Sequence, residues 1–255
     1  MRNESRELLY IHLHASERFA ITSGITFQDF YQSLAKPIQN ILLLKHQYKY
    51  AEYNMHTKLE FVYQEDVPKL IKGHAERSED FCWIDFEDEA ALSALEGQEI
   101  AELLYLSHSK NHLRPPFYRM LNNQYAYLSQ NDGYFNKMYF RSIDQFFLLL
   151  GNVLPDKMIS LKVEKTWLGM RKKSEYPNIP LEIFIRLSPL MAEGIIFSFE
   201  KVEQNRVRME IPLWIIGDHM DVDEMVDDYL ANNMMEPDAK LIYIKKTREW
   251  ALVLK

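Results

Sequence analysis

The sequence predicts an α+β protein of mainly antiparallel sheet with several helices, arranged as two packed subdomains or around one shared core. Hydrophobic residues make up 47% of the chain, which is enough to bury a sizeable core. Segments of strand character follow one another in pairs across short polar turns, and few helical segments separate them. Parallel strands need a long crossover connection for each pair, so this order favours antiparallel pairing.

The first half of the chain alternates extended stretches with short helices. Thr26-Phe-Gln-Asp29 has the pattern of a capping box, which predicts a short helix that ends near Pro37. Leucines at helical spacing predict a longer helix over residues 87–109, which Gly97 divides in two. Stretches rich in aliphatic and aromatic residues predict four strands, the middle two forming a hairpin, over residues 8–14, 41–53, 58–64 and 81–86.

Pro115-Pro116 marks the expected domain boundary. Neither proline has an N–H group, and each favours extended geometry in the residue before it, so the preceding helix cannot continue. We therefore expect an N-terminal α+β unit over residues 1–114. A C-terminal unit of mainly antiparallel sheet with two helices is expected over residues 115–255.

The second half of the chain is expected to consist chiefly of hairpins. Asp132-Gly133 lies between two aromatic stretches, which predicts a hairpin of residues 124–129 with residues 134–141. Ser142 opens a helix that ends before Pro155, and Asp221 caps a helix over residues 222–232. Alternation and pairing predict the remaining strands over residues 159–163, 181–187, 195–202, 207–216, 241–246 and 249–254.

Composition and motifs exclude several classes of protein. The single cysteine, Cys82, cannot form an internal disulfide, and no apolar run has the length of a membrane span, so we expect a cytoplasmic protein. Glycines lie at least 18 positions apart, which excludes both the dinucleotide-binding and the Walker A glycine motifs. A serine nucleophile elbow, a zincin helix and paired cysteines are also missing. Cofactors stay unknown, and an enzyme with a dispersed active site is not excluded.

Positive charge gathers in the middle of an acidic chain. The net charge is −7, but residues 105–173 carry 11 Lys and Arg against 4 Asp and Glu. On the predicted hairpin, Phe135, Lys137, Tyr139 and Arg141 share one face, because alternate residues of a strand point the same way. Cations beside aromatic rings suit anionic partners. The candidate binding residues are His108, His112, Arg114, Arg119, Lys137, Tyr139 and Arg141.

These residues suggest a non-enzymatic binding module with a basic aromatic hairpin. Its expected partner is a nucleotide, a single-stranded nucleic acid or an acidic protein, and oligomers are an open alternative. The simpler interpretation is an ordinary hairpin whose cations pair with the acidic helix before Pro115.

A metal-dependent hydrolase is the alternative function. His12 and His14 lie two apart on the first strand, so both imidazoles could face one metal ion, although two solvent-facing histidines would show the same pattern. Gly217-Asp218-His-Met-Asp221 resembles the metal-bridging aspartate motif of metallophosphoesterases. The upstream Asp-x-His and the downstream Gly-Asn-His of that family are absent. A cap on the following helix also explains Asp221.

Overall fold

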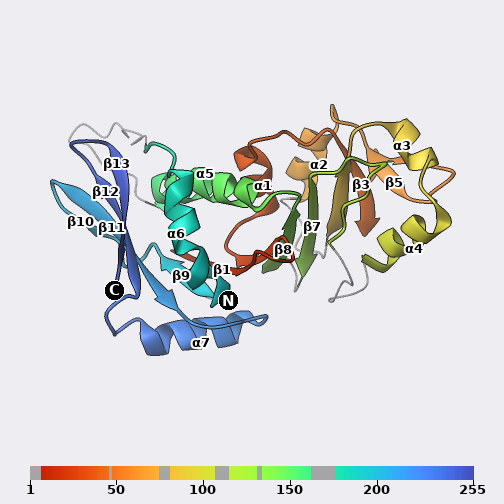
Figure 1. Ribbon diagram of the computed structural model, residues 1–255. Helices are drawn as coiled ribbons and strands as arrows, with labels where there is room; N and C mark the ends of the chain where they lie inside the picture. The colour runs from red at the N-terminus through yellow and green to blue at the C-terminus, as the bar shows by residue number, and fades with distance from the viewer. Residues whose placement is uncertain (1–6, 46–47, 75–80, 107–114, 131–133, 162–175) are drawn as a thin grey trace. The chain divides into compact units, whose positions relative to one another are not determined.

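The computed structural model describes the chain except residues 1–6, 46–47, 75–80, 107–114, 131–133 and 162–175 (Figure 1). The described residues form seven helices and thirteen strands, which confirms the α+β class. They divide into two compact units. Unit 1 contains Met1–Leu13, Thr22–Ile25 and Phe146–Lys255, and unit 2 contains His14–Ile21 and Thr26–Gln145. The division therefore differs from the one expected at residue 114, because unit 1 joins the beginning of the chain to its end.

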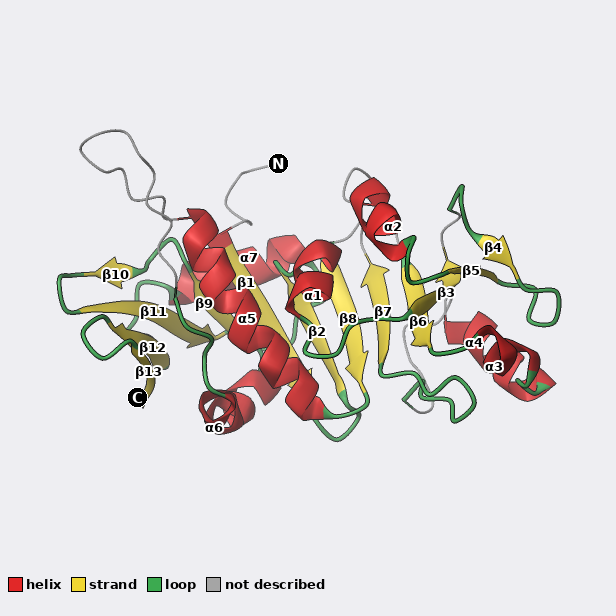
Figure 2. Cartoon of the chain, turned by 90° about the horizontal axis from the view of Figure 1, so that it is seen from above, coloured by secondary structure: helices red, strands yellow, loops and turns green. Residues whose placement is uncertain are grey.

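Unit 1 is built on antiparallel strands in the order β13-β12-β11-β9-β1, and β10 adds to β11. Helices α5 and α6 lie on one side of β1 and β9, and α7 lies on the other side (Figures 1 and 2). Helices on both sides explain why β9 is buried throughout. The strands are β1 (Leu8–His14), β9 (Ile195–Ser198), β10 (Glu203–Gln204), β11 (Arg208–Ile215), β12 (Ala239–Ile244) and β13 (Glu249–Leu254), and the helices are α5 (Ile143–Leu161), α6 (Leu181–Ala192) and α7 (Val222–Asn232).

Unit 2 contains antiparallel strands in the order β8-β7-β6-β3-β5-β4. Its core is aromatic: Phe27 and Phe30 of α1 both pack against Trp83 of β6. Strand β2 (Phe19–Ser23) crosses the boundary between the units. The other elements are β3 (Asn40–Lys45), β4 (Glu52–Tyr53), β5 (Glu60–Val62), β6 (Cys82–Phe86), β7 (Tyr125–Gln130) and β8 (Phe135–Phe140), with α1 (Phe27–Ser33), α2 (Val67–His74), α3 (Glu89–Ser93) and α4 (Gly97–Leu106).

Several local patterns are confirmed. Thr26 and Asp29 form a full capping box on α1, and Asp221 caps α7 by accepting from the N–H groups of Asp223 and Glu224. Strands β7 and β8 pair from Tyr125 opposite Phe140 onward, although residues 131–133 of the expected turn lie outside the described residues. The helix over residues 87–109 is divided before Gly97. The long strand expected over residues 41–53 is interrupted, and β5 pairs with both β3 and β4.

Three predictions in unit 1 were wrong. Helix α5 passes through Pro155 and extends to Leu161, because the carbonyl of Gly151, which Pro155 cannot bond, accepts from the N–H of Ile179 at 3.0 Å. This approach needs glycine, since a Cβ at residue 151 would lie 2.7 Å from the carbonyl oxygen of Ile179. Residues 159–161 of the strand expected over residues 159–163 belong to α5, with residues 162 and 163 outside the described ranges, and residues 181–187 belong to α6.

The described part of the chain contains no helix with both the length and the apolar character needed to span a bilayer.

Candidate functional site

The expected binding residues are only partly described. His108, His112 and Arg114 lie outside the described residues. Arg119 is exposed on the loop before β7, whereas Lys137 and Tyr139 lie on β8 and Arg141 follows it directly.

The aromatic face of β8 is not an open platform. Phe135 is 1% exposed and Tyr139 is 2% exposed. Lys137 is half-buried, with its ammonium 4.0 Å from the centroid of the Phe19 ring and 5.3 Å from that of Tyr139. Burial lowers the pKa of Lys137, while the charge of Glu17 opposes this effect. Lys137 and Arg141 are both half-buried, and Phe19 packs beside Tyr139 with the ring centroids 5.2 Å apart.

Two arginines instead meet at a phenylalanine. The guanidinium carbon of Arg18 lies 5.0 Å from the centroid of the Phe117 ring, and that of Arg141 lies 5.6 Å from it. Arg18 also donates to the carbonyl of Arg141 at 3.4 Å. All three side chains are half-buried. We call Arg18, Phe117 and Arg141 the arginine cluster.

Asn123 positions the arginine cluster through hydrogen bonds. Its buried side chain accepts from the N–H of Tyr118 at 2.8 Å and donates to the carbonyl of Pro116 at 2.9 Å, which fixes the loop on both sides of Phe117. The backbone carbonyl of Asn123 accepts from Nε of Arg141 at 2.7 Å. One asparagine therefore positions both the ring and one of the two guanidinium groups.

Asp85 on β6 binds the backbone at the start of β7, directly after Asn123. Its carboxylate accepts from the N–H groups of Gln124, at 3.0 Å, and Tyr125, at 2.6 Å. Burial raises the pKa of Asp85 to about 7, although these hydrogen bonds and the positive charge of Arg141 lower it. The positive charge of Arg141 therefore favours the ionised form of a buried carboxyl group whose pKa lies near neutral pH.

Arg18 occupies an unusual backbone position. Its φ of 59° lies in the left-handed region, which residues other than glycine adopt rarely. The turn is closed by the bond from the N–H of Arg18 to the carbonyl of Ala15. Such a conformation costs about 1 kcal/mol relative to glycine, so the arginine side chain is retained there at the expense of stability.

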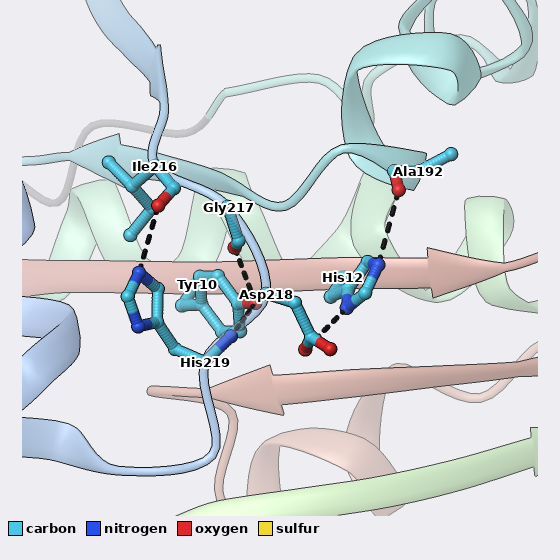
Figure 3. A network of polar contacts seen from close by, with 7 residues as sticks. All are labelled: Tyr10, His12, Ala192, Ile216, Gly217, Asp218 and His219. Atoms are coloured by element: carbon cyan, nitrogen blue, oxygen red, sulfur yellow. Dashed lines mark hydrogen bonds and ion pairs between the residues drawn. The ribbon is translucent and has the colours of Figure 1, made fainter.

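A second polar network lies in unit 1 (Figure 3). His12 on β1 is buried, and its Nδ1 lies 2.8 Å from Oδ1 of Asp218 while its Nε2 lies 3.1 Å from the carbonyl oxygen of Ala192. Tyr10 donates to the carbonyl of Gly217 and accepts from the N–H of His219, each at 2.9 Å. Burial raises the pKa of Tyr10 above its ordinary value, so its hydroxyl stays a donor.

This network links β1, the end of α6 and the loop before α7. Both ring nitrogens of His12 lie within hydrogen-bonding distance of oxygen atoms of the chain, one on the Asp218 side chain and one on the Ala192 backbone. The geometry therefore supports a structural role for His12, which ties the loop containing Asp218 to the body of unit 1.

The candidate metal-ligand side chains make different contacts in the structure. The ring of His14 stacks on Phe19 at 4.3 Å, and Asp221 caps α7, so neither side chain joins the hydrogen bond between His12 and Asp218. Nε2 of His219 lies 2.8 Å from the carbonyl of Ile216 and 3.1 Å from Oδ2 of Asp228. Within the ranges that the structure describes, no three His, Cys, Asp or Glu side chains come together in a way that could hold a metal ion.

Sequence reasoning did not find Arg18, Phe117, Asn123 or Asp85. They come from three separate parts of unit 2, the turn at Arg18, strand β6 and the loop before β7, and no sequence motif connects them. No protein-family model, curated protein or solved structure matches the chain, so its function has to be inferred from its own residues.

Proposed function

We propose that the chain is a non-enzymatic binding protein that holds oxyanion groups of a partner at the arginine cluster and Arg119. One observation carries this proposal. Arg18, Arg119 and Arg141 make no ion pair with any carboxylate in the described part of the chain. No carboxylate among the described residues therefore lies within ion-pair distance of these guanidinium groups, whereas the simpler interpretation of the sequence required such pairs. The charge of Arg141 also acts on Asp85.

The position of Phe117 indicates which chemical groups of a partner the arginine cluster can bind. Both guanidinium groups already lie over its ring, so the ring orders the cations and is not a free platform for a nucleobase. Guanidinium groups bind carboxylate and phosphate oxygens through short charge-assisted hydrogen bonds. The cluster thus favours recognition of phosphate or carboxylate groups over recognition of a base.

The reactive side chains in the described regions support a binding protein. Both nitrogens of His12 face acceptors within the chain. Cys82 is buried, and burial raises the pKa of its thiol, which disfavours the reactive thiolate. We infer a cytoplasmic location from the single cysteine alone.

Arg18→Gly gives the sharpest test, because glycine relieves the left-handed backbone while removing the guanidinium. The full chain is titrated with inorganic phosphate, labelled oligouridylate and an oligoglutamate peptide. We expect saturable binding of at least one of them, weakened by salt and weakened roughly tenfold in Arg18→Gly. Arg206→Gln, at an exposed site in unit 1, is the matched control and should bind as the native protein does.

The three probes separate the sources of the oxyanion. Binding of oligouridylate alone would indicate a nucleic-acid partner, and binding of oligoglutamate alone would indicate an acidic protein. Equal losses in Arg18→Gly and Arg206→Gln, or no binding of any probe, would overturn the proposal.

A further inference from the structure

Helix α7 presents a fixed surface on unit 1 that is separate from the arginine cluster and carries the opposite charge. Tyr229 is buried and is held by Oγ of Ser198 at 2.8 Å and by the carboxylate of Glu200 at 2.6 Å. Trp214 packs edge-on against the ring of Tyr229 at 5.8 Å and donates to the carbonyl of Met235 at 3.3 Å. The helix is therefore anchored along its inner face and at its C-terminal end.

The outer face of α7 carries exposed acidic residues, and exposed apolar residues lie at and just beyond its C-terminal end. Asp223, Asp227 and Leu230 follow one another at spacings of four and three residues, which places them in one stripe along α7, and Met234 lies in the turn that follows the helix. Leu230 is 50% exposed and Met234 is 86% exposed, and both aspartates are also exposed. We call these four residues the α7 stripe.

Acidic side chains repel one another along α7, although Asp223 and Glu224 in its first turn also interact favourably with the helix dipole. Asp223 and Asp227 lie one turn apart, as do Glu224 and Asp228, and like charges at this spacing destabilise a helix by a few tenths of a kcal/mol per pair. The sequence has no Lys or Arg between residues 218 and 238 to offset them. Among the described residues, neither Asp223 nor Asp227 has an ion pair. A cationic partner would relieve this repulsion.

The exposed apolar end points to the shape of that partner. Methionine is flexible and polarisable, so exposed methionine and leucine side chains adapt to apolar groups laid against them. An amphipathic helix presents charged and apolar side chains at the same one-turn spacing as the α7 stripe. Its cations can face Asp223 and Asp227 while its apolar residues cover Leu230 and Met234.

We infer that the α7 stripe docks a cationic amphipathic helix of a partner protein. The order of the stripe sets the orientation of that helix, because charged and apolar contacts occupy different ends. Salt screens the contacts between charged groups but not the apolar contacts, so the affinity for the partner helix falls with ionic strength without vanishing.

The test uses the full chain and a labelled synthetic peptide whose lysines are one turn apart and are followed by leucines at the same spacing. A peptide of the same composition in scrambled order is the comparison. Asp227→Lys turns the Asp223 pair from repulsive to attractive, so the helix should remain folded. We expect this variant to bind the ordered peptide roughly threefold to tenfold more weakly than the native chain.

Glu203→Lys on β10, an exposed acid of unit 1 outside the stripe, is the matched control and should leave affinity unchanged. Equal binding of the ordered and scrambled peptides would overturn the inference, because it would show attraction to net charge alone. Equal losses in Asp227→Lys and Glu203→Lys would overturn it too. Light scattering provides a further check: self-association of the native chain that Asp227→Lys abolishes would assign the stripe to a second copy.

Discussion

Asp85 gives the most quantitative prediction, through the dependence of stability on pH. Burial raises its pKa from 3.8 to about 7 in the folded protein. For an acid whose folded pKa is raised, the stabilisation is fully present below the unfolded pKa and is lost as pH rises through the folded pKa. The difference of about three pKa units corresponds to a loss on the order of 4 kcal/mol between roughly pH 4 and pH 8.

The assay compares the native chain with Asp85→Asn, which cannot ionise. Urea unfolding followed by tryptophan fluorescence, repeated at pH 5, 6, 7 and 8, gives the free energy of unfolding of each. We expect the native chain to lose stability relative to Asp85→Asn as pH rises, mostly below pH 7. Asp144→Asn, on the exposed first turn of α5, controls for removal of one carboxylate. A gain of native stability with pH, relative to Asp85→Asn, would show that the N–H bonds and Arg141 outweigh burial, and would refute the reasoning.

Three further substitutions test the fold of unit 1 and its polar network. Gly151→Ala places a Cβ 2.7 Å from the carbonyl of Ile179 and should lower stability by about 1 to 3 kcal/mol in thermal unfolding, whereas Gly73→Ala in α2 meets nothing within 4 Å and should be neutral or stabilising. Asp221→Ala removes the cap of α7 and should cost about 1 kcal/mol, and an unchanged melting temperature would contradict the capping role. His12→Leu removes the ring contacts to Asp218 and Ala192 and should cost about 1 to 3 kcal/mol in urea unfolding; a variant as stable as the native chain would show that the network contributes nothing.

Local sequence patterns predicted the elements whose signals are themselves local. The capping box at Thr26, the cap at Asp221 and the hairpin of β7 with β8 each depend on residues a few positions apart. These interactions form wherever the backbone adopts the matching turn, so their sequence signals are reliable.

Elements that depend on distant contacts were not predictable. Alternation over residues 181–187 indicated a strand, but the buried residues of α6 are Ile183, Phe184, Leu187 and Met191, a helical pattern that extends beyond that stretch. Helix α5 continues past Pro155, and the carbonyl of Gly151 that the proline leaves without its helical donor is satisfied by the N–H of the distant Ile179. Neither fact is visible in a short window of sequence.

The candidate site shows the same limit. Sequence reasoning placed positive charge near Arg141 but chose the aromatic residues of β8 as its companions, and those rings are core. The companions in the structure are Phe117 and Arg18, brought together by Asn123 and by the turn after β1. Strand alternation tells which residues share a face, but not whether another segment covers that face.

The salt dependence of probe binding decides whether Arg18 contacts the partner. For whichever of oligouridylate and oligoglutamate the native chain binds, the logarithm of its affinity is plotted against that of salt concentration, for the native chain and for Arg18→Gly. Loss of one cationic contact should make the slope shallower by about one and lower the affinity at every salt concentration. Two superimposable lines would mean that Arg18 does not touch the partner and that the cluster serves only to stabilise unit 2.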